Sequence, residues 1–515
     1  VGLFSAAKAA RRVDDHYDVK GDVLLTNNSR LALTFNHGDP FRSVPRIFLD
    51  DDRAWINTLN RLSASYTVSR AAWVSETRFG YTRAIQVRTD GYFSQKDPNN
   101  PEESFTGART LPRLSTGLGF SGPEGEANRS GGPLYSISQK LAHSVGRHFF
   151  KFGGNFSYLT GTRNNPEMPS FFFPDLDALL TNTPRSVTVT FGNGDFSMRA
   201  YQFGMFLQDD FRATSRLTLN LGLRYDFYSN WRSTGKAGTP TAGLHNPSFL
   251  SMDGLYTVGP FRPAEDPFRH DKLNLGPRFG FAYNPDGQGK TAIRGGYGAM
   301  FTQNTAEIGW FATAIAPNIP SRQEFASASI SRFGIRYPTY NADSLRFVQQ
   351  LAQEAGTTPR NVFQMFDPGV RAPYSMQFSL DIQRQLTPTL VLSTGVVGTR
   401  GVSLIMFRAA NRVDRITGLR PNPNLSQPVY TDNAQSLTYW AWQSSLRKRF
   451  ANRVSFDASY TWSKGLSNGG GDFGAWFTGE NSNGLNQEFF DLKADRGPTS
   501  FDLTHFFTAG WVYEL

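Results

Sequence analysis

The sequence predicts an all-β fold, a transmembrane antiparallel up-and-down β-barrel with long external loops. From Leu217 to Phe227 apolar and polar residues alternate without interruption, and a strand places successive side chains on opposite faces. The same alternation recurs along the chain in pairs of runs joined by short turns. Long polar stretches separate the pairs, although loops beyond about 15 residues are uncommon inside compact soluble domains. Short turns at one end and long loops at the other are typical of outer-membrane barrels.

The composition agrees with strands that carry apolar residues on one face only. Hydrophobic residues make up 39% of the 515 residues, and the mean hydropathy is −0.41. No run approaches the roughly 18 consecutive apolar residues that a membrane helix needs. The 44 Phe, 19 Tyr and 9 Trp residues suit strands and the two interfaces of a bilayer. We therefore favour a membrane barrel over a helical membrane protein.

We expect about 15 strands, most of them in pairs that meet at a tight turn. Turn-forming sequences such as Pro285-Asp286-Gly287 and Thr387-Pro388 join the two members of a pair. The expected pairs are Asp14–Thr26 with Arg30–His37, Leu59–Ser69 with Ala71–Ala84, Pro133–Ala142 with His148–Tyr158, Met198–Phe211 with Leu217–Tyr228, Lys272–Tyr283 with Lys290–Phe301, Pro373–Leu386 with Thr389–Gly398, and Leu437–Phe450 with Val454–Ser463, followed by a single strand from Phe501 to Leu515.

Long connections rich in Gly, Pro, Asn, Asp and Ser separate these pairs. They cover Gln86–Gly132, Thr160–Ser197, Ser229–Asp271, Thr302–Ala372, Arg400–Ser436 and Lys464–Ser500. Ala342–Ala355 has helical spacing and predicts a surface helix in the longest of them. Whether such a helix would act in gating is left open by the sequence.

Motifs of enzymes and metal sites are not convincing in this chain. Gly287–Thr291 ends like a phosphate-binding loop, but Asn284 stands where that loop needs its first Gly, and a strand follows instead of a helix. Asp50-Asp51-Asp52 predicts a solvated acidic loop rather than a calcium site. The seven His residues show no zinc spacing, and no Gly-x-Ser-x-Gly elbow is present. We predict no enzyme, no cofactor and no metal.

The absence of Cys and the net charge of +10 narrow the possibilities further. Without Cys the chain has no disulfide framework, thiolate nucleophile or Cys metal site. The positive charge is not gathered into a compact Lys/Arg cluster, so we do not expect nucleic acid as a partner.

The amino-acid sequences of several strand pairs also resemble those of a known family. The segments are Tyr201–Phe211 followed by Leu217–Asp226, Leu275–Tyr283 with Lys290–Gly298, Arg447–Phe450 leading to Ala458–Lys464, and Asp495–Pro498 with Asp502, His505 and Trp511–Leu515. Together they resemble TonB-dependent receptors, and most of all the Oar-like subgroup. The resemblance implies a barrel of about 22 strands in the outer membrane. It also implies a plug and import of a bulky solute with energy relayed by TonB.

The resemblance has one important departure from the family pattern. No plug, TonB box or carboxypeptidase-regulatory-like sandwich is recognisable in the sequence. We therefore expect residues 1–515 to be a fragment of the barrel, with about 15 of its roughly 22 strands. The expected partners are outer-membrane lipid, an unknown solute (a peptide, a glycan or a chelate), and the TonB complex, reached through a missing N-terminal segment.

Charged residues on the polar faces of strands are the first candidate functional residues. Arg224, Asp226, Arg294 and Asp381 would face the lumen, because an Arg turned toward lipid at mid-bilayer costs roughly 2–4 kcal/mol. There they could contact a plug or line a solute path, or they could simply pair with one another across neighbouring strands.

A Gly-rich loop provides the second group of candidates. Phe473, Trp476 and Phe477 lie in or beside the run Asn468–Gly474 and could stack on a sugar or peptide ligand. The alternative is a flexible loop without a binding role.

Three functions remain open at this stage. The first is import by a TonB-dependent receptor, and the second is a non-importing surface barrel, such as an adhesin or a secretion-associated or structural outer-membrane protein. The third is a soluble all-β carbohydrate-binding or propeller protein, which the rhythm of short and long connections disfavours.

Overall fold

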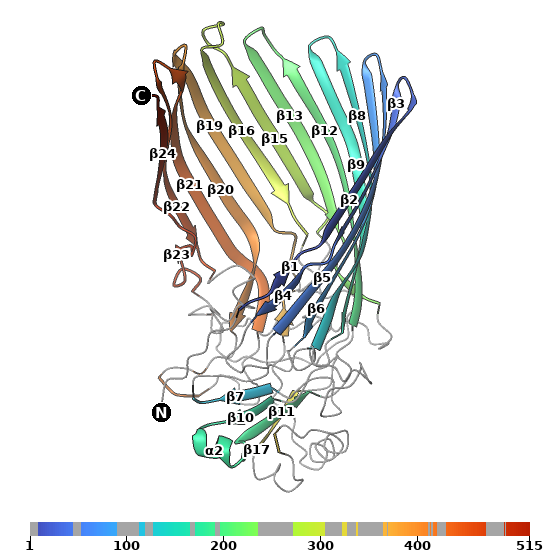
Figure 1. Ribbon diagram of the computed structural model, residues 1–515, viewed down its shortest axis with the longest axis vertical. Coiled ribbons are helices and arrows are strands. Elements are labelled where there is room, and N and C mark those ends of the chain that lie inside the picture. Colours follow the sequence, from blue (N-terminus) through green and yellow to red (C-terminus); the bar gives the residue numbers. More distant parts are fainter. Residues whose placement is uncertain are drawn as a thin grey trace.

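The fold is one large, strongly curved β-sheet with a much smaller second sheet beside it (Figure 1). The computed structural model describes residues 9–44, 53–89, 113–118, 127–164, 170–190, 196–234, 271–303, 322–326, 336–337, 364–367, 369–409, 413, 416–419, 429–469, 489 and 491–515. Within these residues the large sheet has 20 strands, and the small sheet has four.

Fifteen strands of the large sheet are long in the described part of the chain. They are β2 (His16–Thr26), β3 (Ser29–Gly38), β5 (Arg53–Arg70), β6 (Trp73–Thr89), β8 (Ala127–Val145), β9 (His148–Asn164), β12 (Phe196–Arg212), β13 (Leu217–Tyr228), β15 (Asn274–Tyr283), β16 (Thr291–Phe301), β19 (Tyr374–Thr387), β20 (Leu390–Ala409), β21 (Val429–Ala451), β22 (Val454–Ser467) and β24 (His505–Tyr513). Each pairs antiparallel with its neighbour in chain order. The predicted strand pairs are confirmed.

Shorter pieces extend this sheet at the end where the long connections leave it. They are β1 (Arg12–Val13), β4 (Phe41–Val44), β14 (Arg232–Ser233), β18 (Gln364–Phe366) and β23 (Gly497–Pro498). Of these, β18 runs parallel to β21.

Most strand ends differ from those expected, and most strands are longer. The clearest case is β20, which continues to Ala409 instead of ending at Gly398, while β21 already begins at Val429. Strict alternation requires one apolar and one wet face, so it fades where a strand leaves the lipid, although the backbone ladder continues. The last strand is shorter than expected and begins at His505. Just before it, the Asp502 carboxylate accepts hydrogen bonds from β22.

The short turns form one continuous rim, which we call the short-turn rim (residues 27–28, 71–72, 146–147, 213–216, 284–290, 388–389 and 452–453), at the top of Figure 1. Backbone bonds join each turn to the next hairpin: Ser69 N donates to Asn28 O, Ser144 N to Ala72 O, Arg212 N to Arg147 O, Asn284 N to Arg216 O, Gln385 N to Lys290 O, Arg449 N to Thr389 O and Glu514 N to Arg453 O. The Gly287–Thr291 segment is a hairpin turn, as predicted. Its Gly287 and Gly289 have φ of +64° and +76°, which favour glycine.

One face of the large sheet is apolar and exposed. Leu221, Phe279, Tyr297 and Phe378 lie in one cross-strand row over β13, β15, β16 and β19. Each of them is 41–51% exposed. Exposed apolar rows of this extent suit a lipid-facing surface. We call this the outer face, and the opposite, polar face the inner face.

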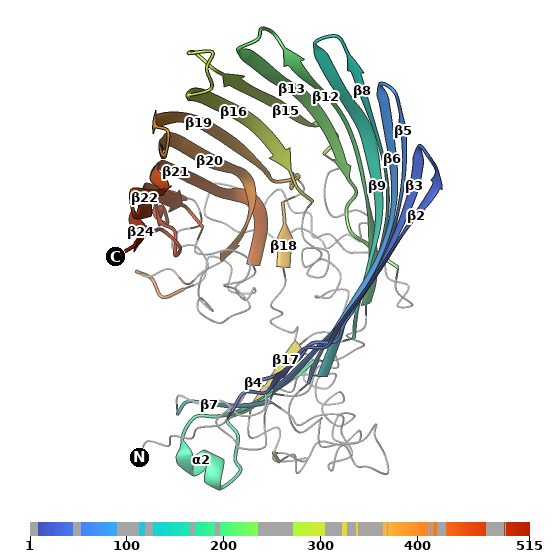
Figure 2. The same cartoon turned by 45° about the horizontal axis from the view of Figure 1, so that its top comes forward.

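The barrel is partial, as the sequence predicts. In the described residues no ladder joins β2 to β24, so these two strands are the edges of the sheet, and Figures 1 and 2 show them apart. No helix in the described part of the chain has the length and hydropathy needed to cross a membrane.

The two faces predict that the same substitution at neighbouring positions of β19 destabilises the protein on one face and has little effect on the other. Leu380 lies on the outer face and Ser379 on the inner face. Leu380 is seven residues from the end of β19, about 16 Å into the bilayer for a tilted strand. We expect Leu380→Arg to lower the free energy of unfolding by about 2–4 kcal/mol in urea titrations in lipid vesicles. Ser379→Arg is the matched control and should change it by less than about 1 kcal/mol; equal losses would contradict the assignment of faces.

Candidate functional site

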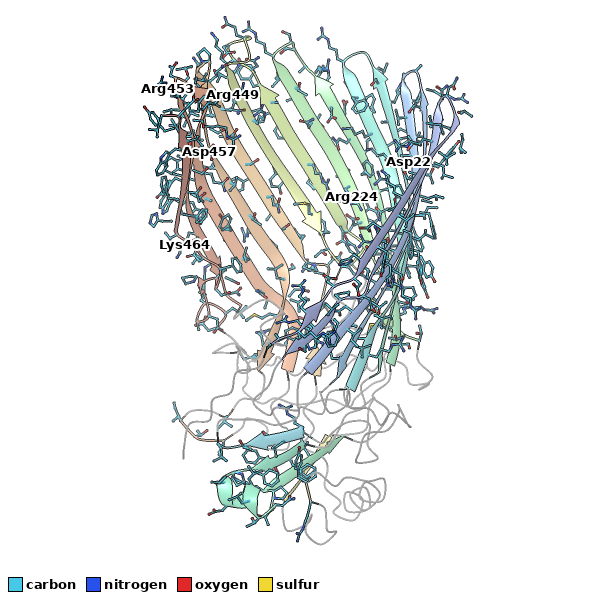
Figure 3. All side chains as sticks on the ribbon, viewed as in Figure 1. Asp22, Arg224, Arg449, Arg453, Asp457 and Lys464 are labelled. Carbon is cyan, nitrogen blue, oxygen red and sulfur yellow. The ribbon has the colours of Figure 1, made fainter. Side chains whose placement is uncertain are left out.

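The inner face of β9, β12 and β13 carries a set of polar side chains that hydrogen-bond in two separate groups. We call it the inner network; its members are Lys151, Asn155, Gln208, Asp210, Asn220, Arg224 and Asp226. The alternation of each strand and the register between the strands place all of these side chains on the same face. Figure 3 labels Arg224 near the middle of the sheet.

Arg224 and Asp226, both predicted to face the lumen, bind each other. Arg224 Nε lies 2.8 Å from Asp226 Oδ2, and Arg224 Nη2 lies 2.7 Å from Asp226 Oδ1. A second bond of 2.8 Å runs from Arg224 Nη2 to Asn155 Oδ1 on β9. Asp226 is only 7% exposed, and a buried charge that loses its partner costs several kcal/mol. The guanidinium therefore keeps a buried carboxylate satisfied.

Gly204 on β12 makes the link between β9 and β13 possible. It lies between Asn155 and Asp226 in the register. A Cβ atom added there would lie 2.7 Å from Asp226 Oδ1 and 2.8 Å from Asn155 Oδ1, and would overlap the Arg224 guanidinium. Because Gly204 has no side chain, the Arg224 guanidinium can extend across β12 to Asn155 on β9.

A second ion pair lies nearer the short-turn rim. Lys151 Nζ is 2.6 Å from Asp210 Oδ2. Gln208 and Asn220 donate to the other carboxylate oxygen, Asp210 Oδ1, at 2.9 and 2.6 Å. The pair is about one-quarter exposed, so its net contribution is modest. Bonds among β9, β12 and β13 nevertheless fix these side chains in one arrangement.

Arg294 and Asp381, the other two predicted lumen residues, also lie on the inner face but are separate from the inner network. They are opposite each other in the register of β16 and β19. Arg294 Nη1 bonds Gln383 Oε1 at 3.0 Å, and the described contacts contain no ion pair between Arg294 and Asp381. Phe473, Trp476 and Phe477 lie outside the described residues, as do Asp50–Asp52 and the helix expected over Ala342–Ala355.

A small sheet, which we call the loop sheet, is built from three long connections. Its strands are β7 (Arg113–Thr116), β10 (Ser170–Phe173), β11 (Ser186–Thr190) and β17 (Arg322–Ala326), in the order β17-β11-β10-β7. The short helix α2 (Leu176–Leu180) follows β10. All of them lie at the end of the molecule opposite the short-turn rim (Figure 1). These strands lie in segments predicted to be loops.

The loop sheet has its own apolar core. Phe171, Phe173, Val187 and Leu114 are between 0 and 6% exposed. Tyr337, from the same connection as β17, meets Phe171 and Phe173 edge to face, with ring centroids 5.6 and 6.4 Å away. The run Phe171-Phe172-Phe173 is the sequence signal that could have predicted a buried strand here.

A buried cluster ties the loop end of β20 and β21 to two further segments. Arg408 pairs with Asp432, its Nη1 donates to the Phe489 carbonyl oxygen, and its guanidinium carbon lies 4.2 Å from the Phe489 ring centroid. Asp367, next to β18, donates its backbone N–H to Thr431 O at 2.9 Å. The cluster therefore holds distant parts of the loop end together.

Asp432 lies outside the lipid region. Arg408, its ion-pair partner, is about 60 Å along the strand from the short turn, whereas the hydrocarbon core is about 30 Å thick. Burial raises the pKa of the Asp432 carboxyl, and the Arg408 guanidinium acts in the opposite direction. Within the described residues, no group of three or more His, Asp or Glu side chains could hold a metal ion.

The close packing at Gly204 can be tested with Gly222, another inner-face glycine of the same sheet. A Cβ atom at Gly222 would meet nothing nearer than 3.5 Å. We expect Gly204→Ala to lower the free energy of unfolding by about 1–3 kcal/mol, because it displaces Arg224 from Asn155 and Asp226. Gly222→Ala should change it by less than about 0.5 kcal/mol. Urea unfolding in detergent micelles measures both, and equal effects would contradict the packing argument.

Two solved structures illustrate the similarity of this fold to known ones. The outer membrane transporter YddB from Escherichia coli is 12% identical, with a TM-score of 0.55; the match covers 89% of this chain and 49% of that one. The FpvAI–pyocin S2 complex contains a chain that is 11% identical, with a TM-score of 0.52 and coverage of 98% and 52%. The chain thus spans about half the length of these structures. No curated protein matches it.

A family model described as an outer membrane beta barrel domain matches residues 2–515. This match extends over the whole large sheet, the loop sheet and the inner network. It agrees with the exposed apolar rows of the outer face and with the arrangement of short turns and long connections. The cell outer membrane is therefore the location of this chain, which belongs to the outer membrane beta barrel domain family.

Proposed function

We propose that this chain is the barrel portion of a TonB-dependent receptor of the Oar-like type. In this proposal the receptor is not an enzyme: it binds a bulky solute with its external loops and imports it through the lumen. The TonB complex would supply the energy through an N-terminal segment and a plug outside these 515 residues. The support comes from the strand sequences, which resemble those of these receptors, and from the architecture of the loop end.

The loop sheet gives the proposal its strongest structural support. Three connections that are far apart in the sequence meet in one sheet with a core of Phe171, Phe173 and Val187. A core of this kind orders the external segments before a solute arrives, which reduces the entropy lost on binding. An ordered surface at the loop end is what a receptor for a bulky solute needs.

The inner network suits the wall of a solute path. Its charges are held in pairs and by amide side chains, so this part of the wall is polar without carrying net charge. We propose that Arg224, Asp226, Arg294 and Asp381 line this path or contact the plug. Phe473, Trp476 and Phe477 are proposed to contact the solute from the loop end.

The test uses cells that carry the full-length gene. Labelled members of the three solute classes, an oligopeptide, a glycan and an iron chelate, are offered to wild-type cells, to cells lacking this gene and to cells lacking the TonB complex. We expect one class to accumulate only when both are present. Binding at the cell surface should require this gene alone.

A variant pair then asks whether the loop sheet takes part. Phe171→Asp places a charge in the core of the loop sheet, whereas Leu180→Asp changes a residue of α2 that is 74% exposed. Phe171→Asp should reduce surface binding at least about tenfold, because an unpaired buried charge disorders the sheet, and Leu180→Asp should leave it unchanged. Solute binding without TonB-dependent accumulation would favour the non-importing surface barrel instead.

A further inference from the structure

The hairpin between β21 and β22 carries three cationic side chains at the short-turn rim: Lys448, Arg449 and Arg453. Arg449 and Arg453 are exposed, and Lys448 is half-buried. None of the three has an ion-pair partner among the described residues. Arg447, in contrast, points to the inner face and binds Asp457, with Arg447 Nε 2.7 Å from Asp457 Oδ2. The Asp457 carboxylate of this hairpin is therefore already paired with Arg447 on the inner face.

The backbone holds these cations in place. Arg449 N donates to Thr389 O at 2.8 Å, and Arg453 O accepts from Glu514 N at 2.9 Å. The hairpin is thus joined to the Pro388-Thr389 turn on one side and to the end of β24 on the other. Figure 3 shows Arg449 and Arg453 at the rim and Asp457 below them.

Apolar and aromatic residues adjoin Lys448 on the outer face. The register places Lys448 between Leu390 and Phe456, and Phe456 beside Trp511. Phe450, in the same hairpin, is 55% exposed. Aromatic side chains of this kind mark the level of the headgroups in membrane proteins. The cations therefore lie where lipid phosphates border the hydrocarbon.

The short turns of outer-membrane barrels face the periplasm. We propose that this hairpin therefore binds the headgroup of an anionic phospholipid in the inner leaflet of the outer membrane. Lys448, Arg449 and Arg453 contact the phosphate, and the acyl chains lie along Phe456 and its outer-face neighbours. A zwitterionic headgroup cannot neutralise three cations, because it carries one phosphate and because the cations repel its ammonium group. Cardiolipin, with two phosphates, fits best, followed by phosphatidylglycerol.

An acidic periplasmic protein is the other class of partner that could meet cations at this rim. Such a protein would use the turn tips alone, whereas Lys448 belongs to an outer-face row of apolar side chains. The position of the cations next to that row favours lipid.

The experiment uses the full-length protein, stripped of lipid in detergent. It is mixed with equal amounts of cardiolipin, phosphatidylglycerol and phosphatidylethanolamine, and native mass spectrometry measures the lipid bound. We expect cardiolipin to be retained most and phosphatidylethanolamine least. The variant Lys448→Gln/Arg449→Gln/Arg453→Gln should bind cardiolipin about tenfold more weakly, since each cation contributes to attraction of an anionic headgroup.

The matched control removes the same charge from the inner face. Arg61, Lys140 and Arg278 are exposed there, away from the short-turn rim, and replacing all three with Gln should leave cardiolipin binding unchanged. The charge-retaining variant Lys448→Arg/Arg449→Lys/Arg453→Lys should bind normally, which separates loss of charge from loss of fold. Equal retention of all three lipids by the wild type, or the same loss in the inner-face control, would overturn the proposal.

Discussion

The constraint on which this structure depends is that every backbone N–H and C=O group within lipid needs a hydrogen-bond partner inside the protein. Water is absent there, and each unpaired group costs several kcal/mol. In the described residues, antiparallel ladders between neighbouring long strands meet this requirement everywhere except at the outer edges of β2 and β24. The bonds from turn to turn continue the pairing to the rim. The long connections lie at the other end, where the chain has left the lipid.

Once the ladder is in place, alternation decides what each face can do. The outer face exposes rows such as Leu221, Phe279 and Tyr297, which are stable in lipid and would be a liability in water. The inner face collects the polar side chains, and they satisfy one another. Arg224 shows how local this balance is, since its bonds to Asp226 and Asn155 require a glycine between them.

The sequence predicted those features that depend on near neighbours in the chain. Alternation located the strands, turn residues such as Pro285-Asp286-Gly287 located the hairpins, and the same parity placed Arg224 and Asp226 on one face. The bond from Arg224 to Asn155 could not be predicted, because it depends on which strand lies two places away and on a register set by the hairpins. The ends of β20 and β21 farthest from the short turns were not predicted, because the alternation of apolar and polar residues stops where both faces of the sheet contact water.

The loop sheet was missed for a different physical reason. Its strands have four or five residues each, too few to show a period, and their partners come from other connections far along the chain. Such a sheet is stable only through tertiary packing, here of Phe171 and Phe173 against Tyr337. Local sequence patterns carry little of that information.

The central claim, that β13 crosses the membrane with its odd-numbered side chains in lipid, has a direct test. Because this chain contains no Cys, single cysteines at each position from Leu217 to Phe227 can be labelled with an environment-sensitive fluorophore in vesicles containing brominated lipid. The assignment predicts quenching by the brominated chains at Leu219, Leu221, Leu223 and Tyr225 and little quenching at the positions between them. Uniform quenching along the strand, or stronger quenching at the even-numbered positions, would contradict it.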